Sequence, residues 1–134
     1  MLGLLIADED IDSRKQMADL FIEAGYNVIV TNSAANALYG ILKKTAQVVL
    51  LSGQFDELTA NDLVPLLKKC NRHLTIILVS DDVSLSLIRK LRKEGIFYHA
   101  LKPVKPEDHE EIRQVVQCAF ENLTNHRHSA RFPE

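Results

Sequence analysis

The sequence has only two cysteines, little net charge and no long hydrophobic run, and each shortage excludes a class of protein. Its 134 residues sum to a formal charge of -2, so no electrostatic attraction to nucleic acid or to an anionic membrane is expected. Cys70 and Cys118 lie outside any CxxC or Cys-His spacing, which favours reduced thiols in a cytoplasmic protein over a zinc site or a disulfide framework. The apolar run 2–7 is too short to cross a bilayer and is followed by acids, so neither a signal peptide nor a membrane span is predicted.

Short apolar runs alternate with helical patterns along most of the chain. The expected strands are residues 2–7, 28–30, 48–51, 74–79 and 96–101, and the expected helices are 13–24, one capped by Ser33, 59–70, 83–94 and 106–123. Five βα units predict a single α/β domain of the doubly wound, flavodoxin-like kind, with a parallel five-stranded sheet in the order 2-1-3-4-5. Residues 1–123 are interpreted as that domain, and residues 124–134, which lack periodicity, as a polar tail or linker.

Polar side chains follow the ends of four predicted strands: Asp8 and Glu9, Ser52, Ser80, and Lys102. In an open parallel sheet, ligands bind beyond the carboxyl ends of the strands, near the point where the strand order reverses. Two acids, two hydroxyls and one ammonium at that point indicate a functional site. The alternative is a polar rim in which the acids begin a helix and the hydroxyls cap the following ones.

Several short stretches are similar to the receiver domain of two-component response regulators, the CheY-like superfamily. The similarity covers about residues 2–122, and its most specific parts are the acidic pair after the first strand and the Lys-Pro pair after the fifth. The stretches that carry it are Ile6-Ala7-Asp8-Glu9-Asp10, Gly25-Tyr26, Val28, Ala37-Leu38, Val48-Val49-Leu50-Leu51, Ile76-Ile77-Leu78-Val79-Ser80 and Lys102-Pro103-Val104. The resemblance implies a signalling domain rather than an enzyme.

In the family that this chain resembles, an aspartate takes phosphate from a histidine kinase beside a bound Mg²⁺. By position, Asp8 and Glu9 would bind the metal together with the backbone carbonyl of Gln54. Ser80 and Lys102 would hold the phosphoryl oxygens, and the ammonium of Lys102 is predicted to form an ion pair with Asp8. At the acceptor position this sequence departs from the family, because it has a serine there.

That serine, Ser52, replaces the side chain on which receiver phosphorylation depends. An acyl phosphate needs an ionised carboxylate as nucleophile, whereas a serine hydroxyl stays protonated at neutral pH and would form a stable ester. A carboxylate ligand for Mg²⁺ is lost as well, so weak metal binding or none is expected. The sequence therefore predicts a pseudo-receiver without catalytic residues, acting as a phosphorylation-independent interaction or regulatory module.

Two alternatives stay open. Asp56, Asp81 or Asp82 could act as a substitute acceptor and keep a conventional Mg-dependent receiver, although Asp56 lies four residues beyond the end of the third strand. A small hydrolase could use Ser52 or Ser80 as nucleophile, although no histidine is expected at the carboxyl end of a strand. A histidine within about 3.5 Å of either hydroxyl would favour the hydrolase.

The resemblance also implies a face for a histidine kinase or an output domain, built by the fourth helix, the fifth strand and the fifth helix. His99 occupies the position of the family's switch ring, and Tyr98 would point to the opposite side of the strand. His99 is interpreted as a packing residue or as a switch that responds to pH. A basic fourth helix and an acidic start of the fifth favour either dipole complementation or a homodimer. The charged residues are Arg89, Lys90, Arg92 and Lys93, and Glu107, Asp108, Glu110 and Glu111.

Overall fold

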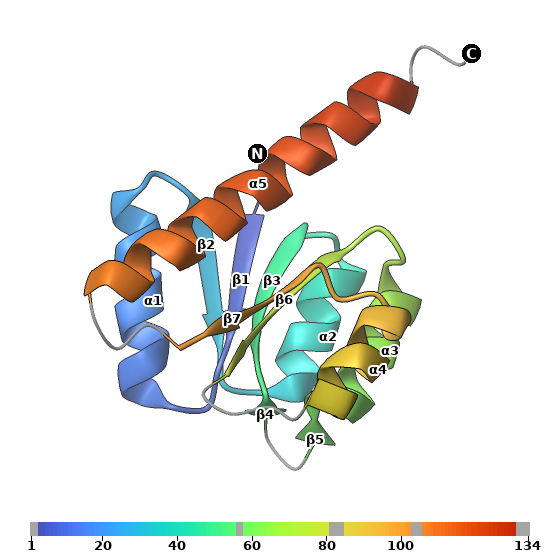
Figure 1. The fold of residues 1–134 in the computed structure, drawn as a ribbon, viewed down its shortest axis with the longest axis horizontal. Coiled ribbons are helices and arrows are strands. Elements are labelled where there is room, and N and C mark those ends of the chain that lie inside the picture. The colour runs from blue at the N-terminus through green and yellow to red at the C-terminus, as the bar shows by residue number, and fades with distance from the viewer. Residues whose placement is uncertain (1–2, 56–57, 81–84, 103–105, 131–134) are drawn as a thin grey trace.

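The computed structural model describes residues 3–55, 58–80, 85–102 and 106–130. Five parallel strands form one sheet: β1 (Gly3–Ala7), β2 (Asn27–Thr31), β3 (Val48–Ser52), β6 (Thr75–Ser80) and β7 (Tyr98–Leu101). Their order, β2-β1-β3-β6-β7, is the predicted one, because β6 and β7 are the fourth and fifth strands of this sheet along the chain. Figure 1 shows the sheet at the centre of the molecule with helices around it.

A small antiparallel hairpin lies between β3 and β6 along the chain, and the sequence did not predict it. β4 (Gln54–Phe55) pairs with β5 (Leu58–Thr59), in the interval between the expected strand 48–51 and the expected helix 59–70. Strands of two residues are too short for an alternating pattern to indicate them. The hairpin leads directly into α3 (Ala60–Cys70), whose start is fixed by Thr59: its backbone N–H and its hydroxyl donate to the Asp62 carboxylate over 3.4 and 3.2 Å.

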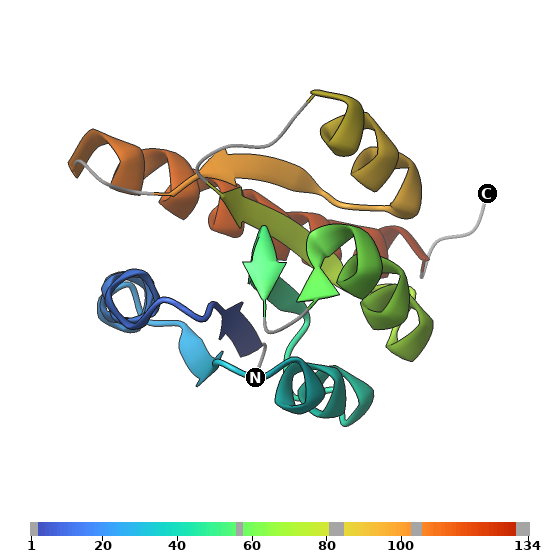
Figure 2. The same cartoon turned by 90° about the horizontal axis from the view of Figure 1, so that it is seen from below.

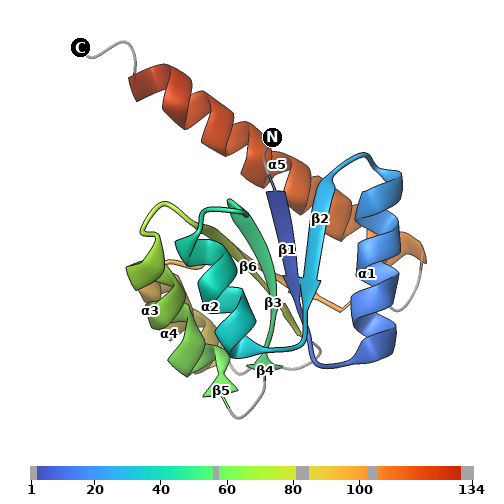
Figure 3. The ribbon, with the colours of Figure 1, turned by 180° about the vertical axis from the view of Figure 1, so that it is seen from behind.

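Helices cover both faces of the sheet, as predicted. α1 (Ile11–Glu23) and α5 (Pro106–Ala130) pack on one face, and α2 (Ala34–Leu42), α3 and α4 (Leu85–Glu94) on the other. Figure 2 shows this division, and Figure 3 shows the α2–α3 side from behind. Every residue of β1, β3 and β6 is buried, because each of these central strands has a helix layer on both sides.

Local polar contacts determine where α1 and α2 begin. The Asp10 carboxylate accepts a hydrogen bond from the Ser13 N–H, so α1 begins at Ile11, slightly before the predicted start. Ser33 caps α2 as predicted, accepting from the Asn36 N–H over 3.3 Å. Asp10 is also the last residue of the loop between β1 and α1. Its cap therefore helps to position this loop, which carries Asp8.

The predicted end of the last helix at Leu123 is wrong. α5 continues to Ala130 through most of the segment interpreted as a polar tail, and its end projects past the sheet (Figure 1). The segment 124–130 contains neither glycine nor proline. Buried residues such as Ile112 and Val116 already hold the first part of α5 in place. Each further residue adds one hydrogen bond without a new nucleation cost, so a polar sequence alone does not end the helix. Despite this length, none of the helices that the structure describes is long and apolar enough to span a bilayer.

Candidate functional site

The carboxyl ends of the central strands bring three polar residues together inside the protein. Asp8 follows β1, and Ser52 and Ser80 end β3 and β6. Strand register places these ends side by side, with Ala7 opposite Leu51 and Ser52 opposite Val79. Asp8, Ser52 and Ser80 are only 2, 5 and 6% exposed. Burial to this degree argues against the alternative of a solvated polar rim. We call these three residues together with Lys102 the strand-end pocket.

Lys102 neutralises the buried acid of this pocket. Its ammonium lies 3.5 Å from Asp8 Oδ2, and the two side chains are 21 and 3% exposed. The predicted ion pair is therefore confirmed. Asp8 Oδ1 accepts a hydrogen bond from the Asp10 N–H over 3.0 Å, while Oδ2 has no hydrogen-bond partner within the described residues. Lys102 is thus the counter-charge that makes burial of this carboxylate tolerable.

The two acids that follow β1 differ in burial. Asp8 is buried, but the Glu9 side chain is exposed to solvent. Arg14, which the sequence analysis did not single out, folds back from α1 and donates from Nη1 to the Asp8 carbonyl over 2.8 Å and to the Glu9 carbonyl over 3.4 Å. The guanidinium holds the β1–α1 loop in shape and adds a second cation beside it. No sequence signal distinguishes this arginine from any other in a first helical turn.

These residues do not fit a strong magnesium site. Hard cations need several oxygen ligands, preferably carboxylates, and the buried carboxylate of Asp8 already faces an ammonium. Among the described residues, no group of three histidine, cysteine, aspartate or glutamate side chains is placed to hold a metal ion. Gln54, whose carbonyl was predicted as a ligand, lies in β4 directly after Gly53. Weak Mg²⁺ binding at Asp8 and Glu9 stays a prediction.

A glycine lets the chain after β3 approach Ser80 closely. A Cβ atom added to Gly53 would lie 3.1 Å from the Ser80 Cβ, tighter than ordinary packing. The loop that follows Ser52 therefore runs against Ser80, and the two hydroxyl-bearing strand ends form one compact unit. Asp56 and Asp81, the predicted substitute acceptors, lie outside the described residues, as does Asp82.

The structure joins Ser80 to His99 by a hydrogen bond of 3.0 Å between Oγ and Nε2. In the β6–β7 register Leu78 lies opposite His99, so Ser80 and His99 share a sheet face. Tyr98 lies opposite Ile77 and points to the other face, as predicted. Burial and the nearby Arg92 lower the pKa of His99 below 6.5.

This distance meets the condition set above for a serine hydrolase. A nucleophile–base pair also needs a third group that orients the base, and no described residue hydrogen-bonds the other ring nitrogen of His99. Ser80 is 6% exposed, which leaves its Oγ little room to meet a substrate. The contact is thus better suited to fixing the ring than to nucleophilic attack.

The face of α4, β7 and α5 carries exposed apolar and charged side chains. Phe97, Tyr98 and Leu101 are 40, 40 and 56% exposed. A cavity of about 260 Å³ lies between β7 and α5, lined by Phe97, Tyr98, Glu111, Gln114, Val115 and Cys118. The basic residues Arg89, Lys90, Arg92 and Lys93 of α4 are all exposed, as are Glu110 and Glu111 of α5. We call this surface the α4–β7–α5 face.

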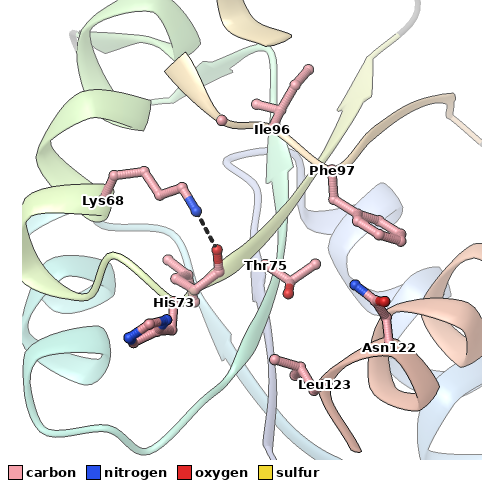
Figure 4. Close-up of a pocket in the computed structure, with 9 residues that line it drawn as sticks. Lys68, His73, Thr75, Ile96, Phe97, Asn122 and Leu123 are labelled. Atoms are coloured by element: carbon pink, nitrogen blue, oxygen red, sulfur yellow. Dashed lines mark hydrogen bonds between the residues drawn. The ribbon is translucent and has the colours of Figure 1, made fainter. Parts of the chain in front are cut away.

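A second cavity, of about 320 Å³, lies at the start of β6 and just before β7, at the other end of these strands from Ser80 (Figure 4). Lys68 lines it, but its ammonium donates to the backbone carbonyls of Leu74 over 2.8 Å and of Arg72 over 3.1 Å. Burial lowers the pKa of Lys68. The lysine ties the end of α3 to the start of β6, a structural role that the sequence analysis missed because both bonds depend on the turn between them.

Comparison with known proteins agrees with this geometry. The family description "Response regulator receiver domain" matches residues 4–117. The DNA-binding transcriptional regulator NtrC of Rhizobium meliloti (strain 1021) is 26% identical over 100 residues, which are 75% of this chain and 21% of NtrC. The chain therefore spans about a fifth of the length of this curated relative.

Two solved structures illustrate the shared fold. A receiver domain protein from Clostridium thermocellum superposes with a TM-score of 0.82 at 19% identity, covering 92% of this chain and 98% of that one. NtrX from Brucella abortus, solved in complex with ADP, gives a TM-score of 0.86 at 20% identity, covering 100% of this chain and 30% of that one. With the parallel sheet and its strand-end pocket, the match over residues 4–117 shows that this chain belongs to the response regulator receiver domain family.

Proposed function

We propose that this chain is a pseudo-receiver, a receiver domain of two-component signalling that acts through protein contacts without taking up phosphate. One observation carries the proposal: a buried serine, Ser52, occupies the acceptor position in a pocket whose remaining carboxylate, Asp8, is paired with Lys102. Among the described residues, the pocket offers neither an ionised nucleophile at the end of β3 nor a cluster of carboxylates for Mg²⁺. A domain of this kind, acting as a regulatory module, has no catalytic residues and needs no resident metal.

The α4–β7–α5 face is the surface that we propose for binding the partner. It combines exposed aromatic and aliphatic side chains, Phe97, Tyr98 and Leu101, with a cavity beside α5. Aromatic groups surrounded by charges are typical of protein-binding surfaces. We propose a histidine kinase or an output domain as the partner, in the cytoplasm. A second copy of the chain is the alternative, because basic α4 and acidic α5 are complementary across a two-fold axis.

Nucleic acid is not among the proposed partners. NtrC is named as a DNA-binding regulator, but the similarity covers only 21% of that protein. The present chain has a net charge of -2 and presents acids as well as bases on the α4–β7–α5 face. Phosphate binding along a duplex needs a concentration of positive charge that this composition does not provide.

Exposure to a small phosphodonor tests the proposal. The protein is incubated with Mg²⁺ and acetyl phosphate, and its intact mass is measured; beryllofluoride binding is followed in parallel by calorimetry. We expect no phosphoryl adduct and no beryllofluoride binding. The matched variant S52D restores the carboxylate and is expected to gain an adduct that hydroxylamine removes, which shows that the donor and the assay work.

A phosphoryl adduct on the natural sequence would overturn the proposal. If the adduct disappears in D56N or D81N, the chain is a conventional receiver with a substitute acceptor. The serine hydrolase is the second candidate, and the Ser80–His99 distance of 3.0 Å is what favours it. A fluorophosphonate probe that labels the natural protein but not S80A would establish a reactive serine; we expect no labelling, because Ser80 is buried.

A further inference from the structure

The cavity that Lys68 lines is a concave site that shares no residue with the strand-end pocket. It lies where α3 ends, β6 begins, the chain enters β7 and α5 leaves the sheet (Figure 4). Its volume of about 320 Å³ is within the range typical of small-molecule sites, which begins at about 300 Å³. A cavity of about 150 Å³ is enough for benzene, so a ligand with a single ring fits here.

Lys68 gives this cavity a positive charge without a counter-charge. Among the described residues that line the cavity it is the only lysine or arginine, and none of them is an aspartate or glutamate. Burial lowers the pKa of Lys68, and no acid in the described part of the chain counteracts this effect. An ammonium group has three N–H donors, and the carbonyls of Arg72 and Leu74 use two of them. One donor of a partly buried cation is therefore left for an anion.

A glycine gives the Lys68 side chain its path to the cavity. Gly95 has a φ of +111°, and a Cβ atom added to it would lie 2.7 Å from Lys68 Cε. The lysine stem thus passes over bare backbone on one side, while two carbonyls hold the ammonium at its other end. The charge is fixed at the edge of the cavity before any ligand arrives, which lowers the entropy cost of binding.

A buried hydroxyl in the same cavity also points to a ligand. Thr75 is 9% exposed and lines the cavity, and within the described residues its hydroxyl makes no hydrogen bond, although its N–H donates to the Gln47 carbonyl. Figure 4 shows Thr75 between Lys68 and Asn122. Because buried polar groups are ordinarily hydrogen-bonded, a ligand that carries oxygen atoms would satisfy this hydroxyl.

We propose that this cavity is a binding site for a small carboxylate with an apolar body, such as a single-ring aromatic acid. The carboxylate lies against the ammonium of Lys68, and the ring lies among the apolar side chains that line the cavity, which are Leu74, Ile96, Phe97 and Leu123. Figure 4 shows Phe97 across from Lys68 and beside Asn122. The inference goes beyond the proposed function, because it gives the domain a small-molecule ligand at the end of β6 away from Ser80.

Titration of the ¹⁵N-labelled chain with 4-hydroxybenzoate, followed by nuclear magnetic resonance, tests the site. We expect saturable shifts of the backbone amides of Thr75 and Phe97, with a dissociation constant of about 1 mM or below, and no shift at Ser80. The amide 4-hydroxybenzamide has the same shape without the charge, and acetate has the charge without the apolar body. Each should bind at least about tenfold more weakly than 4-hydroxybenzoate.

Two variants and a matched control locate the ligand. K68M should weaken binding about tenfold or more and T75V about fivefold, whereas K69M, which removes an exposed lysine, should bind like the natural chain. Shifts that do not saturate or that centre on Ser80, equal binding of the benzamide, or unchanged binding in T75V would overturn the inference. Should K68M fail to fold, T75V and the benzamide comparison still decide. The acetyl phosphate assay reports on the strand-end pocket, so its result is separate from this one.

Discussion

Removing Lys102 should destabilise the protein more than removing any ordinary surface lysine. In the variant K102M, the Asp8 side chain would lose its counter-charge at a position that is 2% exposed. At 3.5 Å the Coulomb attraction is about 5 kcal/mol for an effective dielectric constant of about 20. Partial exposure of Lys102 and the hydrogen bond from the Asp10 N–H reduce the net loss. We expect K102M to cost about 2–3 kcal/mol of unfolding free energy.

A double-mutant cycle isolates the ion pair from the other consequences of substitution. Urea unfolding is measured for the natural chain, K102M, D8N and the double variant, with K15M as the control for loss of an exposed lysine. We expect a coupling energy of about 2 kcal/mol between the two sites, and an effect of K15M within about 0.5 kcal/mol. Because the pair is largely buried, the coupling should persist at high salt.

The reasoning would be refuted by a K102M variant as stable as K15M, or by a coupling energy under about 0.5 kcal/mol. Either result would mean that water or another group compensates Asp8. The acid could then still attract a metal ion, and the argument against a strong magnesium site would lose its main support.

Three further predictions concern the framework around the pocket. G53A should cost about 1–2 kcal/mol of unfolding free energy, because its Cβ would lie 3.1 Å from the Ser80 Cβ; no loss in urea unfolding would contradict the close approach. K68M should cost about 1–2 kcal/mol by leaving the carbonyls before β6 without a donor, whereas exposed K69M should be near neutral. Since the pKa of His99 is lowered in the folded state, the stability that neutral His99 contributes is fully present above pH 6.5 and is lost as the pH falls from there through the lower folded-state pKa. Stability of the natural chain relative to H99Q should therefore rise between about pH 5 and about pH 7, and a flat difference would contradict the lowered pKa.

The sequence alone determined the fold and the chemical character of the strand-end pocket. Apolar runs, their helical partners and the handedness of βα connections permit few arrangements, so the order of the main sheet follows from the pattern. The residue types at the strand ends were also visible in the sequence: a serine, Ser52, ends the third strand, and Lys102 follows the fifth, so an ion pair with Asp8 was expected and is confirmed. These conclusions depend on composition and spacing, which a sequence states directly.

Apart from that ion pair, only the tertiary structure decided which side chains of the site touch. The bond between Ser80 and His99 depends on the register of β6 against β7 and on the ring's rotamer, and periodicity encodes neither. The contact of Arg14 with the carbonyls of the β1–α1 loop and the continuation of α5 to Ala130 have the same origin. Such features result from competition among contacts between residues distant along the chain, and that competition is resolved only when the whole core is packed.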